Sequence, residues 1–235
     1  MANGNYTETL RRPGFLAFFW TQFLGAFNDN FLKIVVSFVA LNLATSASAN
    51  YVELIAFLFI LPSALFSGYA GHLADVYSKR TILVTVKLWE IAIMTFALTA
   101  FFFGQIQLML VGVFLMGLHA AFFSPAKYGI LPEMLPEKDL SRGNGLLEMS
   151  TFTAIILGTS LGSAIFSVWK YNLPLIGLVM IAIAVLGYFT SLGISHVPPS
   201  GAAKLLRLNP FSEIIRLAKI SNQSNQPCDC MLPCE

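Results

Sequence analysis

Six long apolar segments constrain the fold of this chain more than any other feature of its sequence. They cover residues 14–45, 52–70, 81–103, 107–125, 146–169 and 173–194. An α-helix needs about 20 largely apolar residues to cross the hydrocarbon core of a bilayer. A soluble helix would repeat polar residues along one face, and segments such as IAIMTFALTAFFFG lack that pattern. The sequence therefore predicts an all-α membrane protein with six transmembrane helices.

Composition supports the same class. Hydrophobic residues make up 56% of the 235 positions, charged residues only 11%, and the mean hydropathy is +0.72. An average soluble domain is about 25% charged. The polar start of the chain is followed by an apolar run that is too long for a cleaved signal and has no cleavage site. We therefore assign residues 1–13 to a cytoplasmic N-terminus and residues 14–195 to the membrane domain.

The distribution of basic residues predicts the orientation. Eleven of the fourteen lysines and arginines fall on one side of the predicted helices. These are Arg11, Arg12, Lys79, Arg80, Lys127, Lys138, Arg142, Lys204, Arg207, Arg216 and Lys219. By the positive-inside rule that side is cytoplasmic, so both termini are expected inside the cell. The formal net charge of +2 is too small to indicate a nucleic-acid partner.

A polar cluster interrupts the first apolar segment. Asn28, Asp29, Asn30 and Lys33 lie inside FLGAFNDNFLKIVVSF. An external loop at this point would leave two segments, 15–27 and 31–42, that are each too short to span a bilayer. We therefore expect one tilted or locally broken helix whose polar residues face a cavity. Asp29 and Lys33 are four residues apart, so they share a helix face and are placed to pair.

Four further ionisable residues fall within or at the ends of predicted helices. Lys87 and Glu90 flank Trp89 in the third helix, Lys127 follows the fourth, and Glu148 begins the fifth. An ionisable group inside a bilayer is costly and usually marks a substrate path. The candidate substrate-binding or gating residues are therefore Asn28, Asp29, Asn30, Lys33, Lys87, Glu90, Lys127 and Glu148.

The connection between the second and third helices carries the motif GHLADVYSKR, residues 71–80. We expect Gly71 to permit a tight turn, Asp75 to cap a helix N-terminus, and Lys79 and Arg80 to hold the loop at the lipid headgroups. The pattern resembles the signature loop of the major facilitator superfamily. The match departs at Val76 and Ser78, where that family usually has Arg and Gly. The resemblance implies that the six helices form one half of a major facilitator bundle.

Two other stretches narrow this resemblance. GAFNDNFLK (25–33) and FFSPAKYGILPEMLP (122–136) look like the lysophospholipid transporter branch of the superfamily. Its members move lysophosphatidylethanolamine and related lipids across the bacterial inner membrane by alternating access, and some are fused to an acyltransferase and acyl-carrier-protein synthetase. By this resemblance, Asp29 between its two asparagines meets an ethanolamine ammonium or acts as a gate. Lys33, Lys87 or Lys127 meets the phosphate.

Helix ends and helix contacts give two further expectations. Pro125 and Pro132 are expected to end the fourth helix and shape a cytoplasmic loop. Gly158 and Gly162 form a G-x-x-x-G pattern, which permits close helix approach in lipid. Members of the superfamily have two six-helix halves, and this chain resembles one. Asp75 and the Gly158/Gly162 face are therefore expected to lack partners unless a second half or a second copy supplies them.

The C-terminal region differs from the rest. Residues 196–220 are expected to form a cytoplasmic linker with an amphipathic helix at 204–220. Residues 221–235 are expected to be an unstructured tail, truncated or frame-shifted. Its three cysteines, Cys228, Cys230 and Cys234, lack a fourth ligand, so no metal site and no cofactor are predicted.

Two other functions stay open at this point. One is a different facilitator transporter, such as a drug or nutrient exporter. The other is a membrane anchor that transports nothing. An enzyme is not expected, because the sequence shows no nucleophile–base set.

Overall fold

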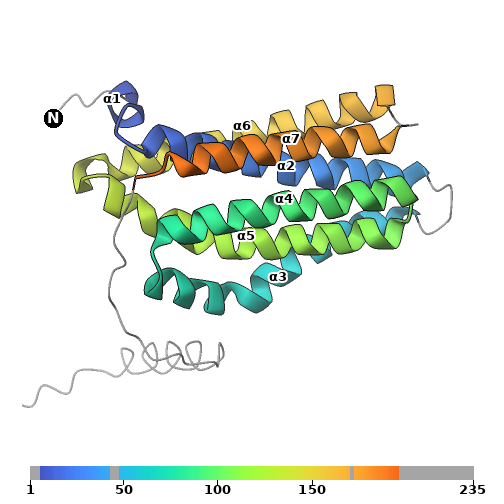
Figure 1. Cartoon of the computed structure of the whole chain (residues 1–235), viewed down its shortest axis with the longest axis horizontal. Coiled ribbons are helices and arrows are strands. Elements are labelled where there is room, and N and C mark those ends of the chain that lie inside the picture. The colour runs from blue at the N-terminus through green and yellow to red at the C-terminus, as the bar shows by residue number, and fades with distance from the viewer. Residues whose placement is uncertain (1–5, 43–47, 170–171, 196–235) are drawn as a thin grey trace, which may run out of the picture. The chain divides into compact units, whose positions relative to one another are not determined.

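The computed structural model of this chain describes residues 6–42, 48–169 and 172–195, and these residues are helical and contain no strand (Figure 1). A short helix α1 (Tyr6–Leu10) comes first. Six long helices follow: α2 (Phe15–Asn42), α3 (Ser48–Val76), α4 (Lys79–Phe103), α5 (Ile106–Met134), α6 (Glu137–Trp169) and α7 (Leu173–Leu192). All six are long and apolar enough to cross a membrane. The predicted all-α membrane fold is confirmed, while the predicted linker and tail, 196–235, lie outside the described residues.

Helix α2 runs through the polar triplet without a break. Its 28 residues include positions 28–30. The alternative of an external loop is therefore excluded, and the helix is continuous rather than locally broken. An unbroken helix satisfies its backbone hydrogen bonds internally, which lipid requires. The three polar side chains are left to find partners inside the bundle.

The expectation for Pro125 and Pro132 is wrong, because α5 continues through both to Met134. A proline lacks the backbone N–H and crowds the carbonyl four residues earlier. Helices in membranes tolerate this where neighbouring helices and polar side chains satisfy the freed groups. The consequence is functional: Lys127 lies on a helix inside the bundle and not in a surface loop.

The expectation for residues 71–80 is also wrong in part. Gly71 and Asp75 belong to α3, so the connection to α4 is only residues 77–78. A β-carbon at Gly71 would meet no atom within 4 Å, which shows that no tight turn or close contact requires glycine there. A glycine inside a helix lowers the stability of that helix by about 1 kcal/mol relative to alanine. A long apolar helix such as α3 tolerates this cost. The motif therefore ends one helix and begins the next.

Small residues allow the helices to approach closely. Helix α2 lies against α6 and α7, and α5 lies against α3 and α4 (Figure 1). A β-carbon on Gly158 would collide with the backbone carbonyl of Phe27, and one on Gly162 would collide with Ile34 and Phe31. The Gly158/Gly162 face therefore packs on α2 within this half. The expectation that it lacks a partner is wrong, and Asp75 is likewise not without one.

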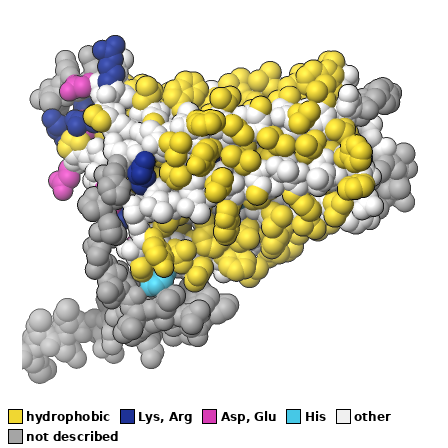
Figure 2. Space-filling model, viewed as in Figure 1, with side chains coloured by type: hydrophobic (Ala, Val, Ile, Leu, Met, Phe, Trp, Pro, Cys, Tyr) yellow, Lys and Arg dark blue, Asp and Glu magenta, His cyan; other side chains and the backbone are white. Residues whose placement is uncertain are grey.

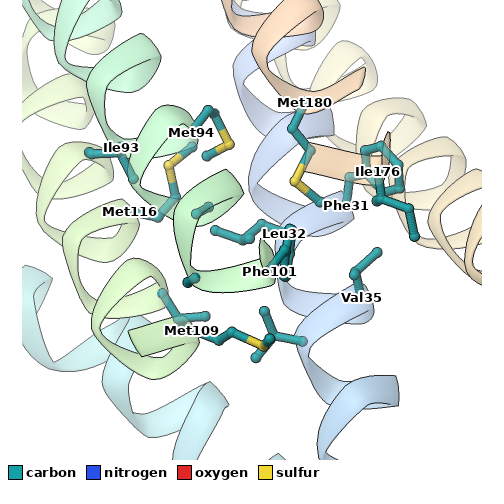
Figure 3. Close-up of a cluster of buried hydrophobic side chains, with 14 of the residues drawn as sticks. Phe31, Leu32, Val35, Ile93, Met94, Phe101, Met109, Met116, Ile176 and Met180 are labelled. Carbon is teal, nitrogen blue, oxygen red and sulfur yellow. The ribbon is translucent and has the colours of Figure 1, made fainter. Parts of the chain in front are cut away.

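One buried apolar cluster fills the part of the bundle beyond the polar triplet. It joins α2, α4, α5 and α7 through side chains such as Phe31, Leu32, Met94, Met116 and Met180 (Figure 3). All five are at most 1% exposed. In lipid such packing is stabilised by van der Waals contact and not by exclusion of water. The cluster fixes the helices that carry the polar residues.

Charged side chains gather at one end of the bundle, while apolar side chains cover its length (Figure 2). Asp139 accepts hydrogen bonds from Arg12 at 2.7 Å and from Arg142 at 3.0 Å. Arg80 donates to the carbonyl of Ile194 at 2.7 Å and so holds the end of α7. This is the end that the sequence predicts to face the cytoplasm.

Lys79 departs from expectation at the same end. It is 8% exposed and pairs with Glu133 at 2.5 Å, so it ties α4 to α5. A lysine held in this way does not reach out to lipid headgroups. None of the four motif residues Gly71, Asp75, Lys79 and Arg80 lines the cavity described next.

Candidate functional site

A polar cavity of about 310 Å³ opens between α2, α3, α4, α5 and α6. It holds most of the ionisable residues predicted from the sequence. Its wall includes Gln22, Gly25, Asp29, Asn30, Lys33, Phe59, Lys87, His119, Phe123, Ser124, Lys127, Tyr128, Glu148 and Thr151. Ligand sites in transporters lie in such places, where helices enclose a hydrophilic space within the membrane.

The asparagine–aspartate–asparagine triplet is divided between the cavity and the interior. Asp29 and Asn30 line the cavity. Asn28 is fully buried on another face of α2, because neighbouring residues of a helix point about 100° apart. Asn30 donates to the carbonyl of Ala26 on its own helix at 2.7 Å. Asp29 is therefore the member of the triplet with an ionisable group at the cavity.

Asp29 and Lys33 lie on the cavity face of α2, but they do not pair as expected. Lys33 Nζ lies 4.1 Å from the centre of the Phe59 ring on α3, which is a cation–π contact. Asp29 Oδ1 is buried and has no hydrogen-bond partner. Within the described residues, no ion pair shorter than 4 Å joins the two side chains. Each is left available to a ligand.

Lys87 and Glu90 form a locked pair behind the cavity. Lys87 Nζ lies 2.6 Å from Glu90 Oε2, and the two side chains are 0% and 1% exposed. Asn28 donates to Glu90 Oε1 at 3.1 Å and to the carbonyl of Met180 at 3.3 Å. The network joins α2, α4 and α7. It pairs both charges and links the three helices.

Gly25 makes room for this pair. A β-carbon at Gly25 would collide with Lys87 Nζ, and Glu90 Oε2 lies close behind. The ammonium group of Lys87 therefore lies against the backbone of α2 at Gly25, at the edge of the cavity. This close approach explains a glycine at this position.

His119 is a cavity residue that the sequence prediction missed. Its side chain is 3% exposed and stacks on the Phe123 ring, with 6.2 Å between ring centres. Its Nε2 lies 3.6 Å from Glu90 Oε2, which is longer than a hydrogen bond. The signal that was available is an ionisable residue in an apolar helix, MGLHAAFF, on the helix that also carries Lys127.

A second, looser charge cluster forms another part of the cavity wall. Lys127 Nζ lies 3.5 Å from Glu148 Oε1 and 3.4 Å from Thr151 Oγ1. Glu148 also accepts a hydrogen bond from the Tyr128 hydroxyl at 3.0 Å. The Glu148 side chain is 39% exposed, so this pair can rearrange at low cost. Gln22 donates to Thr151 at 3.0 Å and links α2 to this cluster.

The cavity wall thus carries two carboxylates, Asp29 and Glu148, and three lysines, Lys33, Lys87 and Lys127. Among the described residues, Asp29 and Lys33 are the members of this set without an ion pair within 4 Å. Such a wall suits a molecule that carries both charges. Within the described residues, no group of three histidines, cysteines or acidic residues is placed to bind a metal ion. The three cysteines lie outside those residues. The arrangement defines a multi-pass membrane protein with a zwitterion-compatible cavity.

Comparison with known proteins gives the family. Residues 18–222 match the Major Facilitator Superfamily, and this chain belongs to it. It is 33% identical over 175 residues to the Lysophospholipid transporter LplT of Klebsiella pneumoniae subsp. pneumoniae. It is 32% identical over 169 residues to the protein of that name from Enterobacter sp.. These alignments cover 72% and 70% of this chain, and the chain spans 40% of either relative's length.

A solved structure shows the same fold. A mutant of the peptide transporter POT, crystallised with sulfate, superposes with a TM-score of 0.66. The match covers 91% of this chain and 44% of that one, at 15% sequence identity. The resemblance to half of a major facilitator bundle is confirmed, as is the resemblance to lysophospholipid transporters.

Proposed function

We propose that this chain forms half of a transporter that moves lysophospholipid, such as lysophosphatidylethanolamine, across a bacterial inner membrane by alternating access. The observation that carries this proposal is the charge pattern of the cavity. Asp29 has a buried oxygen without a partner, while Lys33 and Lys127 present cations on the same wall. The named relatives support the choice of lipid.

The roles of the cavity residues follow from their contacts. Asp29 meets the ethanolamine ammonium, because a charge-assisted hydrogen bond would satisfy its free oxygen. Lys33 and Lys127 meet the phosphate. Lys87 is a weaker phosphate ligand than the sequence suggested, because Glu90 already neutralises it at 2.6 Å. Asn28, Asn30 and Glu90 hold the site in place, and Glu148 keeps Lys127 occupied until a phosphate displaces it.

The architecture implies a partner for this half. In transporters built from repeats, the substrate site lies between two repeats that rock against each other. The cavity here is bounded by helices of one such unit. We propose that a second six-helix unit, or a second copy of this chain, closes the opposite side, with the basic end of the bundle in the cytoplasm. An acyltransferase is a candidate consumer of the delivered lipid.

Transport in vesicles tests the proposal. Together with its second six-helix unit, or as a dimer, the protein reconstituted in liposomes should carry a fluorescent lysophospholipid inward, and Asp29→Ala should slow this by about tenfold or more, as expected for loss of a charged hydrogen bond. Glu53→Ala is the matched control, since Glu53 is an exposed carboxylate that is absent from the cavity wall. Equal rates for both variants would remove Asp29 from the mechanism. Transport of unrelated drugs or nutrients in place of the lipid would favour a different facilitator.

A further inference from the structure

His119 differs from the other cavity side chains that are at least nine-tenths buried. Four polar side chains that line it are at least nine-tenths buried: Gln22, Lys87, His119 and Lys127. The first donates to Thr151, the second to Glu90, and the fourth to Thr151. In the described part of the chain, neither ring nitrogen of His119 has a hydrogen-bond partner. Buried polar atoms normally do, so an empty one at a ligand cavity calls for an explanation.

The neighbours of His119 do not supply that partner. Glu90 Oε2 lies 3.6 Å from His119 Nε2, which is beyond hydrogen-bond distance. The backbone of Val86 also approaches the ring, but without hydrogen-bond geometry. The Phe123 ring stacks against the imidazole and restricts its rotation. Both nitrogens of the imidazole are therefore buried at the cavity wall without a hydrogen bond.

A neutral imidazole offers one N–H donor and one bare nitrogen acceptor. A hydroxyl group is also both donor and acceptor, so it matches either nitrogen of such a ring. A phosphate only accepts and an ammonium only donates, and the cavity already provides Lys33, Lys127 and Asp29 for those groups. The chemistry that His119 fits is a neutral hydroxyl beside a zwitterionic headgroup.

A lysophospholipid has such a hydroxyl. In its 1-acyl form the second acyl chain is missing, which leaves a free hydroxyl on the glycerol carbon next to the phosphate-bearing carbon. A diacyl phospholipid carries an ester at that carbon and has no hydroxyl to donate. The bilayer is made of diacyl lipids, so a carrier for one-chain lipids must distinguish the two.

We propose that His119 recognises the free glycerol hydroxyl of the lipid and so selects one-chain over two-chain phospholipids. This rests on the proposed function and adds a specificity determinant to it. Sites that hydrogen-bond a substrate hydroxyl reject analogues without it strongly, because their own polar groups are then left unpaired. Gln22 and Thr151 bond each other and contribute less to this selection.

The test is a binding comparison between two lipids that differ by one oxygen. The probes are 1-acyl lysophosphatidylethanolamine and its 2-deoxy analogue, titrated against the purified full chain in lipid nanodiscs. We expect the deoxy analogue to bind about 10- to 100-fold more weakly. In His119→Met, which keeps an apolar side chain of similar size, the two lipids should bind equally, at the level of the deoxy analogue. In His119→Gln, which keeps a donor and an acceptor, part of the preference should return.

Three other results would contradict either the role of His119 or the proposed function. Equal binding of both lipids to the unaltered chain overturns the role of His119 and leaves the proposed function intact, with water satisfying the imidazole. A His119→Met variant that binds both lipids more weakly by the same factor assigns the residue to structure alone and also overturns it. Binding of neither lipid to the unaltered chain overturns the proposed function and this inference with it.

Discussion

Two ion pairs lie at the same cavity and differ in almost every physical respect. Lys87 and Glu90 lie 2.6 Å apart with side chains 0% and 1% exposed. Lys127 and Glu148 lie 3.5 Å apart, with side chains that are 7% and 39% exposed, so only the carboxylate of this pair reaches the surface. The first pair is fixed further by Asn28, whereas the second shares its atoms with Thr151 and Tyr128.

The difference separates structure from binding. Removing one partner from a buried pair leaves an uncompensated charge and costs about 3–5 kcal/mol. Breaking an exposed pair costs about 0–1 kcal/mol, and the exposed carboxylate of Glu148 brings the second pair nearer to this limit than the first. We therefore expect Lys87 and Glu90 to hold α2, α4 and α7 together, and we propose that Lys127 exchanges Glu148 for a phosphate. The same residue types perform different tasks because their burial differs.

The largest expected effect comes from breaking the buried pair. Glu90→Gln should lower the free energy of unfolding by about 3–5 kcal/mol, because Lys87 is then a buried charge without a counter-charge. Unfolding in detergent, followed by circular dichroism, measures this. Replacing both Lys87 and Glu90 by leucine should restore most of the lost stability. A single variant as stable as the unaltered protein would contradict the structural role.

A smaller loss of stability should follow from a substitution that displaces the Lys87–Glu90 pair without removing either charge. In Gly25→Ala the new β-carbon would collide with Lys87 Nζ, which Glu90 holds in place, so the unfolding free energy should fall by about 1–3 kcal/mol. Gly145→Ala is the control, because a β-carbon there meets nothing within 4 Å. That change should be neutral or stabilise α6 by up to about 1 kcal/mol. Similar losses in both variants would show that the lysine does not need the space.

The smallest effect on stability is expected at the open pair. Glu148→Gln should change the unfolding free energy by less than about 1 kcal/mol. It should at the same time free Lys127 and raise affinity for an anionic lipid headgroup by about 2- to 5-fold. Lipid titration alongside the unfolding experiment measures both quantities. A large loss of stability with unchanged affinity would make this pair structural as well, and the comparison would fail.

The sequence predicted the helices well, because span length and apolar composition are properties of single segments. It also placed Asp29 and Lys33 on one face correctly. The continuation of α5 through Pro125 and Pro132 was missed, because the tolerance of proline depends on neighbouring helices that a sequence does not show. Lys79 was misplaced for a similar reason, since its partner Glu133 is 54 positions away.

His119 and Asn28 are two site residues whose contacts could not be predicted from the sequence. A histidine in an apolar helix gives no sign of whether it finds a partner, and only the packing of α4 against α5 reveals that it does not. Asn28 has the same residue type as Asn30, yet one joins Glu90 in the interior and the other bonds its own helix at the cavity. The side of a helix that faces the cavity depends on how the six helices pack together, and a sequence does not show that packing.

Photochemical labelling tests most directly whether the polar cavity binds the lipid headgroup. A lysophospholipid with a photoreactive group on its headgroup, irradiated with the protein in nanodiscs, should modify residues within 25–33 and 119–128. Excess unlabelled lysophosphatidylethanolamine should suppress that modification. Modification confined to exposed apolar positions such as Phe152 and Val168, and insensitive to the competitor, would contradict the cavity as the lipid site.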